Sequence, residues 1–177
     1  HELKDYALIV NIDKDINGEQ AKLLFADGTT KAVTTDVAYD GTSSRANIGD
    51  LVTYEVKKGE YVLTKAETSD ADKAGFDKIV ANTYANTSGK GKIGGESIAD
   101  DAVIFVKDNA GKFSTMTGSD FAKYSSASVK SISNAYANKD NSTGYNSVVL
   151  AYAELNAKVN SITSNYGYVT SAVSTTK

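Results

Sequence analysis

The stretch YVLTKAE at residues 61–67 returns as VVLAYAE at residues 148–154, and this pair carries the fold prediction. Both copies are rich in β-branched and aromatic residues, which favour strands. Upstream, VTTDVAY at residues 33–39 is matched in the same order by IADDAVI at residues 98–104. Blocks that keep their order predict a degenerate tandem repeat of similar β units.

These blocks divide the chain into two units and a remainder. We expect a first β unit at residues 1–70 and a second, longer β unit at residues 71–160. Residues 161–177 are expected to form a linker and the first strand of a further unit, because NYGYV at 165–169 echoes DYALI at 5–9. The chain is therefore predicted to be a segment of a longer array, and its 177 residues accommodate two small domains.

Turn signals separate short apolar segments throughout the chain. The predicted class is all-β, with two tandem small β-barrel or β-sandwich units joined by short helical linkers. In the first unit we expect strands at residues 6–12, 20–26, 30–37, 48–56 and 61–67, with a turn at 13–18 and a hairpin signal at Asp27 and Gly28. A short capped helix or linker is expected at residues 68–77. In the second unit we expect strands at residues 78–84, 102–107, 112–117, 128–137 and 146–154, and one helical turn at 120–124 capped by Ser119.

One segment fits two structures. A helical stripe is formed by Val148, Ala151, Tyr152, Leu155, Val159 and Ile162. The repeat favours a strand at residues 146–155, because the counterpart at 61–67 carries β-branched residues and is followed by acidic turn residues. A short helix or linker is then expected at residues 156–164.

The composition argues against several classes of protein. The chain has no Cys, Pro or Trp, and its single His is His1. Its net charge is −3 and Arg45 is the only arginine, whereas nucleic-acid binders usually cluster basic residues and use arginine. No apolar stretch approaches the ~20 residues of a membrane-spanning helix. We therefore expect neither nucleic-acid binding nor membrane insertion.

The candidate catalytic groups are few. The chain has no internal His and no Cys, so the sequence argues against hydrolases that use a Ser-His-Asp or Cys-His site. Glu96, Asp100 and Asp101 form a small acidic cluster, which we interpret as turn-capping rather than as a glycosidase pair. The glycine-rich residues 89–95 lack the spacing of a phosphate-binding loop. We expect no enzyme activity, no catalytic residue and no cofactor.

Calcium is the one metal that the sequence raises. Asp13, Asp15 and Asn17 match the first half of an EF-hand-type loop, where closely spaced oxygens bind the ion and Gly18 permits a sharp turn. The twelfth position, which normally supplies a bidentate acid, is Leu24. A polar hairpin turn is the alternative interpretation of the same residues.

The tyrosines raise a second kind of binding. Tyr54, Tyr61, Tyr136, Tyr145 and Tyr152 fall on predicted hairpin strands, and two aromatic rings on one face can stack on sugar rings. Tyrosine is also an ordinary half-buried strand residue, so a packing role competes with a carbohydrate site.

The segments IADDAVIFVKD at residues 98–108 and IGDLVTYEV at residues 48–56, with the strand at 61–67, resemble repeated β modules of bacterial surface-layer proteins. Such modules occur beside surface-layer-homology modules, which bind cell-wall polymer. The resemblance implies an exported, non-enzymatic, self-assembling protein, often with calcium. It carries no catalytic motif, and an anchoring module is not visible in this sequence.

Together these observations predict a structural segment of a secreted bacterial surface-layer or cell-envelope protein that contributes to self-assembly or surface display. Its partners would be other copies of the protein, and cell-wall polysaccharide through modules outside this chain. A carbohydrate-binding module and an adhesin stalk domain are the alternatives.

Overall fold

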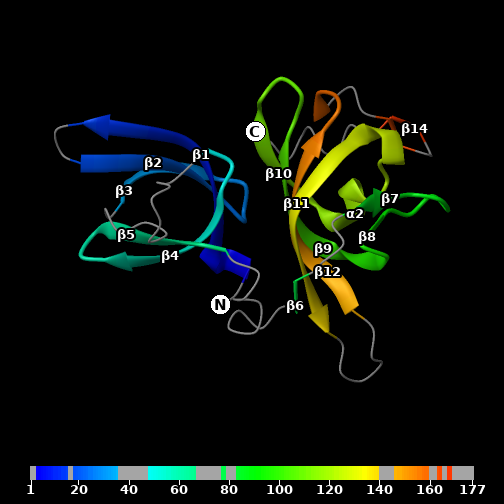
Figure 1. Ribbon diagram of the computed structural model, residues 1–177, viewed down its shortest axis with the longest axis horizontal. Coiled ribbons are helices and arrows are strands. Elements are labelled where there is room, and N and C mark those ends of the chain that lie inside the picture. The colour runs from blue at the N-terminus through cyan, green and yellow to red at the C-terminus, as the bar shows by residue number, and fades with distance from the viewer. Residues whose placement is uncertain are drawn as a thin grey trace. The chain divides into compact units, whose positions relative to one another are not determined.

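The computed structural model describes residues 3–15, 18–35, 48–66, 77–78, 83–139, 146–159, 163–164 and 167–168. The chain divides into two compact units, His1–Asp70 and Ala71–Lys177. Strands dominate the described residues of both units (Figure 1), which confirms the predicted all-β class.

The first unit is a five-stranded antiparallel sheet. After the 3-10 turn η1 (Leu3–Asp5), its strands are β1 (Tyr6–Asp15), β2 (Gly18–Phe25), β3 (Thr30–Thr34), β4 (Leu51–Lys57) and β5 (Glu60–Lys65). They lie in the order β3-β2-β1-β4-β5. Alternate residues of these strands point to one face of the sheet, because side chains alternate along a strand. The buried core on that face consists of Ala7, Ile9, Ala21, Leu23, Val33, Val52 and Leu63.

Two tight turns set the register of this sheet. Gly28 has a φ of 88°, a left-handed conformation that glycine adopts without a steric cost, in the predicted turn between β2 and β3. Lys58 and Gly59, with φ values of 53° and 80°, connect β4 to β5. Both central residues of this two-residue connection have positive φ, as in a type I′ hairpin turn.

The edges of the first sheet approach one another without forming a ladder. One isolated parallel bridge joins Thr35, just after β3, to Tyr61 on β5. The described residues form no closed barrel, so the predicted small barrels are not seen as such. A single bridge leaves the sheet curved and open, because closing a barrel requires continuous pairing around its whole circumference.

The second unit is a mixed sheet. Its strands are β6 (Asp77–Lys78), β7 (Tyr84–Ala85), β8 (Lys92–Ile93), β9 (Glu96–Lys107), β10 (Phe113–Thr117), β11 (Val129–Lys139) and β12 (Asn146–Leu155). The order is β6-β11-β12-β9-β8-β7, and β10 pairs with β9. The β9 and β12 strands are parallel, whereas the other neighbours are antiparallel. A separate two-stranded ladder joins β13 (Thr163–Ser164) to β14 (Gly167–Tyr168).

The predicted hairpin of the second unit is confirmed. Strands β11 and β12 pair antiparallel from Val129 opposite Leu155 to Lys139 opposite Asn146. Residues 146–155 are therefore a strand and not the start of a helix. Apolar residues of β12, including Val148, Ala151 and Ala153, contribute to the main core of this unit.

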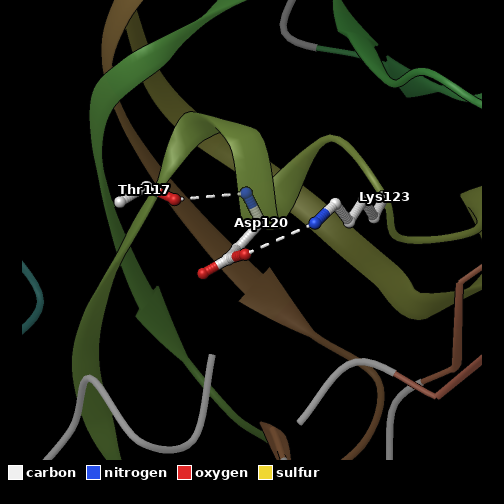
Figure 2. Close-up of polar contacts among 3 residues, drawn as sticks. All are labelled: Thr117, Asp120 and Lys123. Atoms are coloured by element: carbon white, nitrogen blue, oxygen red, sulfur yellow. Dashed lines mark hydrogen bonds and ion pairs between the residues drawn. The ribbon is translucent and has the colours of Figure 1, made fainter. Parts of the chain in front are cut away.

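A single turn of α-helix, α2 (Gly118–Phe121), packs on β9 in this core. Its N-cap is Thr117, whose hydroxyl oxygen accepts a hydrogen bond of 3.2 Å from the backbone N–H of Asp120 (Figure 2). The predicted helical turn is present, but its N-cap is Thr117 and not Ser119 as predicted. The helix begins earlier because Gly118, which has no Cβ, lets the turn approach the backbone of Ala99 closely.

The two units do not share a strand order, although the matching sequence blocks predicted similar units. The first block, residues 61–67, lies largely in the edge strand β5, whereas residues 148–154 lie in β12 between β9 and β11. An alternation of apolar and polar residues identifies a strand but not its neighbours, so the short match predicted the element and not its place.

Other predicted boundaries shift. The β1 strand continues to Asp15 and β2 begins at Gly18, so residues 13–15 and Gly18, predicted to lie in a turn, belong to strands. Of the predicted linker at 68–77, only Asp77 is described, and it begins β6. Of the predicted strand at 78–84, Lys78 lies in β6 and Tyr84 begins β7, while residues 79–82 lie outside the described part of the chain. Residues 160–162 of the predicted linker at 156–164 and most of the predicted further unit also lie outside it. Within the described part of the chain, no helix is both long and apolar enough to cross a membrane.

Candidate binding groove

An aromatic groove opens at one end of the inner face of the first sheet. Phe25 ends β2, Tyr54 lies on β4 and Tyr61 lies on β5, and all three are in phase with core residues of their strands. The ring centroids of Phe25 and Tyr54 are 5.4 Å apart at an interplanar angle of 70°. Those of Tyr54 and Tyr61 are also 5.4 Å apart, at 33°. The three half-buried rings form a continuous apolar floor.

The groove has a volume of about 290 Å³. Its polar rim combines both signs of charge, and the lining residues besides the three rings are Lys4, Ala26, Asp27, Thr29 and Lys31. The volume lies just below the roughly 300–1,000 Å³ range of ligand pockets, which suits a small group rather than an extended chain.

The turn between β2 and β3 fixes the acidic side of the rim. One carboxylate oxygen of Asp27 accepts hydrogen bonds from the Thr29 hydroxyl at 2.6 Å and from the Thr29 backbone N–H at 2.9 Å. The hydrogen bond from the Thr29 side chain, followed by that from its backbone, lowers the pKa of Asp27 below its usual value. Asp27 is therefore an ionised, oriented acceptor at neutral pH.

The basic side of the rim stands over a ring. The Lys31 ammonium lies 6.0 Å from the centroid of the Tyr61 ring, within the range of a weak cation–π contact. Lys31 is exposed, and on β3 it lies opposite Leu23, whose side chain is in the core. The ammonium group thus sits at the mouth of the groove.

The tyrosine hydroxyls differ in their partners. The Tyr54 hydroxyl donates a hydrogen bond of 3.0 Å to the backbone carbonyl of Lys4, which ties β4 to the η1 turn. Burial, with a smaller contribution from nearby Tyr61, raises the pKa of Tyr54 above its usual value. Tyr54 therefore stays neutral at physiological pH and holds the floor of the groove in place.

Val56 continues the apolar surface outward. It follows Tyr54 by two residues on β4, so it points to the same face, and it pairs directly with Tyr61. Its side chain is 54% exposed, which makes it one of the few large apolar residues on the described surface. The groove and Val56 together form a platform that can stack on a flat or ring-shaped ligand with apolar faces.

Of the five predicted tyrosines, the structure brings two together. Tyr54 and Tyr61 meet in the groove, Tyr136 and Tyr152 are buried in the second unit, and Tyr145 lies outside the described residues. The sequence reasoning missed Phe25 and Lys31. The alternation of side chains along β2 and β3 is visible in the sequence. Placing Phe25 and Lys31 on the inner face also requires the register of β2 with β1 and of β3 with β2, which the sequence does not specify.

The candidate calcium residues lie in or beside the β1–β2 ladder. Asp13 pairs with Gln20 and Asp15 pairs with Gly18, while Asn17 lies outside the described residues. Among the residues that the structure describes, no group of three or more His, Cys, Asp or Glu side chains gathers as a metal site would require. Calcium binding at this hairpin stays a prediction.

The acidic cluster of the second unit lies along one strand. Glu96, Asp100 and Asp101 all belong to β9, and the last two are exposed. The register of β9 with β12 shifts between Ile98 and Val103, so Asp100 and Asp101 lie on an irregular, exposed part of the strand.

A second, wider cleft of about 490 Å³ lies at the turn between β9 and β10. It is lined mainly by polar residues, including Lys107, Lys130, Glu154 and Asn156. Buried Asp108 accepts hydrogen bonds from the backbone N–H groups of Ala110 and Lys112, both at 2.9 Å. These contacts stabilise the turn itself, so Asp108 has a structural role here.

Comparisons with protein-family models, with curated proteins and with solved structures found no match to this chain.

Proposed function

We propose that this chain is a non-enzymatic structural segment of a bacterial surface-layer or cell-envelope protein that contributes to self-assembly or surface display. The resemblance of residues 48–56, 61–67 and 98–108 to surface-layer β modules supports this proposal. The division of the chain into two compact, strand-dominated units is consistent with it. The protein would then be extracellular, with other copies of itself as its main partners and cell-wall polysaccharide bound through modules outside this chain.

The observation that carries the proposal is the exposed edge strand β3. Thr30, Lys31, Ala32 and Thr34 are exposed on this strand, and only Val33 is buried. It pairs with β2 along one side, whereas at its other side the described contact is the single bridge from Thr35 to Tyr61. An edge strand offers backbone hydrogen-bonding groups to a strand of another molecule, which is a common route of lateral association.

We further propose that the first unit is a partly open small barrel. Its strand order β3-β2-β1-β4-β5 and the parallel bridge between the two edges support this description. That arrangement is similar to five-stranded, partly open barrels that bind oligosaccharides or oligonucleotides.

Electron microscopy and analytical ultracentrifugation test the assembly proposal. We expect the protein to form sheets or large oligomers, and the Ala32→Lys variant to lose them, because a lysine on an edge strand opposes strand addition. The matched control is Ser133→Lys, which places a lysine at an exposed position of β11 in the second unit and should leave assembly unchanged. Measurements with and without millimolar calcium show whether the ion is required. A protein that stays monomeric under both conditions contradicts the proposal.

A further inference from the structure

The aromatic groove of the first unit shares Lys31 with the edge strand β3, but its floor of Phe25, Tyr54 and Tyr61 lies on β2, β4 and β5. Its rings face the mouth of the curved sheet, on the same face as the core. A surface that serves only assembly through β3 needs neither an aromatic floor nor a rim of mixed charge. The groove is therefore a candidate binding site for a separate ligand.

The charges of the rim restrict that occupant. Lys4 and Lys31 disfavour a cationic ligand, and Asp27 disfavours an anionic one. The hydrogen bonds from Thr29 keep the carboxylate ionised, so the rim presents an oriented acceptor on one side and an ammonium donor on the other. A neutral ligand rich in hydroxyl groups satisfies both, since each hydroxyl donates and accepts hydrogen bonds.

The floor restricts the occupant further. Tyr54 and Tyr61 are tilted by 33° rather than stacked, and Val56 extends their surface outward. A ligand with a flat apolar face of C–H groups removes the aromatic rings from water. A purely polar ligand would leave these rings exposed to solvent. Nucleobases also stack on aromatic rings, but single-stranded nucleic acid needs a basic groove. Acidic residues outnumber basic ones in residues 1–70, which disfavours phosphate.

We propose that the groove formed by Phe25, Tyr54 and Tyr61 is a binding site for a neutral oligosaccharide, with one pyranose ring on the Tyr54–Tyr61 floor. Asp27 and Lys31 hydrogen-bond the hydroxyl groups at the two sides of the ring. The volume of about 290 Å³ accommodates a single sugar ring better than a long segment, so neighbouring rings extend over Val56 into solvent. This inference does not depend on self-assembly.

Titration calorimetry on the full 177-residue chain tests the proposal with defined probes. The neutral probes are hexasaccharides of glucose, N-acetylglucosamine and mannose, the acidic probe is oligogalacturonate, and the nucleic-acid probe is a 15-nucleotide oligothymidylate. We expect at least one neutral hexasaccharide to bind, with an affinity that changes little between 50 and 500 mM salt, because no ion pair with the ligand forms.

Variants locate the binding. Tyr61→Ala is expected to weaken the association at least ~tenfold through the lost stacking surface, and Asp27→Asn a few-fold through the lost acceptor charge. The matched control is Phe113→Ala in the second unit, where a lysine also lies over an aromatic ring: Lys107 is 5.5 Å from the Phe113 centroid, and Lys31 is 6.0 Å from the Tyr61 centroid. That control should leave the affinity unchanged.

Three results would overturn the site. These are the absence of binding to every neutral hexasaccharide, equal losses for Tyr61→Ala and Phe113→Ala, and tighter, salt-dependent binding of the oligothymidylate or the oligogalacturonate. Thermal unfolding of each variant identifies a loss that comes from unfolding. If Tyr61→Ala does not fold, Tyr61→Phe is measured in its place. This variant keeps the aromatic ring, and it should bind the hexasaccharide as the wild type does.

Discussion

At the scale of single residues, Tyr84 connects a short strand of the second unit to its helical turn. Its hydroxyl lies 2.7 Å from the carbonyl oxygen of Tyr124 and 3.1 Å from that of Phe121. The side-chain amide nitrogen of Asn86 donates hydrogen bonds to the backbone carbonyls of Tyr124 at 2.8 Å and Ala122 at 3.2 Å. These bonds satisfy carbonyl groups at the end of α2 that the short helix leaves without partners.

Titration of Tyr84 makes the stability of the second unit depend on alkaline pH. Burial raises the pKa of Tyr84 from 10.0 to about 12. Between pH 10 and 12 the unfolded chain releases this proton while the native chain retains it, so the free energy of unfolding falls as pH rises. Below pH 10 both states are protonated and this stabilisation is fully present.

We expect Tyr84→Phe to reduce the slope of stability against pH above 10 and to cost about 1 kcal/mol at pH 8 from the lost hydrogen bonds. Some slope remains because burial also raises the pKa of Tyr124. Urea unfolding followed by circular dichroism between pH 8 and 11.5 measures both effects. Superimposable slopes for wild type and Tyr84→Phe would contradict this account.

Gly91 is required beside the Tyr84 ring. A Cβ at this position would collide with the hydroxyl and with ring carbons of Tyr84, whose position is fixed by its hydrogen bonds. The Gly91 backbone N–H also donates a hydrogen bond of 2.7 Å to the carbonyl of Ala122. The backbone at residue 91 and the ring therefore cannot separate without losing contacts.

We expect Gly91→Ala to destabilise the second unit by about 1–3 kcal/mol, as overpacking of a filled site does. Gly111→Ala is the control, since a Cβ there meets no atom within 4 Å and the cost comes only from its φ of +85°. Thermal unfolding of the two variants gives the comparison. If Gly91→Ala proves no more harmful than Gly111→Ala, the close approach to Tyr84 has little energetic weight.

At the scale of elements, sequence alternation predicted most strands of the two sheets. The hairpin of β11 and β12 was predicted correctly because its apolar residues alternate and its two segments are adjacent in the chain. The cap of α2 was misplaced because Ser119 and Thr117 are both common capping residues, so residue type does not single out Thr117. What decides between them is the contact of Gly118 with β9, which is distant in sequence.

The capping assignment gives a matched pair of variants. Thr117→Ala removes the acceptor of the Asp120 N–H and is expected to cost roughly 0.5–2 kcal/mol, while Thr117→Ser should cost little. Ser119→Ala should be nearly neutral. The nearby ion pair between Lys123 and Asp120, at 3.8 Å (Figure 2), is partly exposed and contributes little by comparison. Chemical denaturation distinguishes the positions, and a larger cost at Ser119 than at Thr117 would refute the cap.

At the scale of the whole molecule, the strand order of the sheets was beyond the reach of the sequence. The groove illustrates the reason: Phe25 and Tyr54 lie on different strands that pair with β1, and only the register of β1 with β2 and β4 brings their rings together. The repeat predicted two units with similar strands. Their different topologies arise from pairings between distant segments, which short matching blocks do not specify.

The two units have separate core clusters, one within residues 7–63 and one within residues 93–159. We therefore expect Gly118→Ala, whose Cβ would lie 2.8 Å from side-chain atoms of Ile98 and Ala102, to destabilise the second core and not the first. Hydrogen exchange measured residue by residue reports each core separately. Protection should fall at Ile104 and Val106 and stay unchanged at Ile9 and Leu23. Equal losses in both sets would show that the units unfold together.

The parallel ladder between β9 and β12 also has a consequence for how the chain acquires its structure. It joins Ser97 to Ser147, 50 positions later in the sequence. Closing so large a loop costs entropy before any contact repays it, and topologies of this kind fold slowly. During synthesis, β9 can pair with β10, but its side that pairs with β12 stays unpaired until β12 has left the ribosome. The unpaired side of β9 is thus a transient hazard for aggregation, and the fast local hairpin of β11 and β12 shortens the time for which it is open.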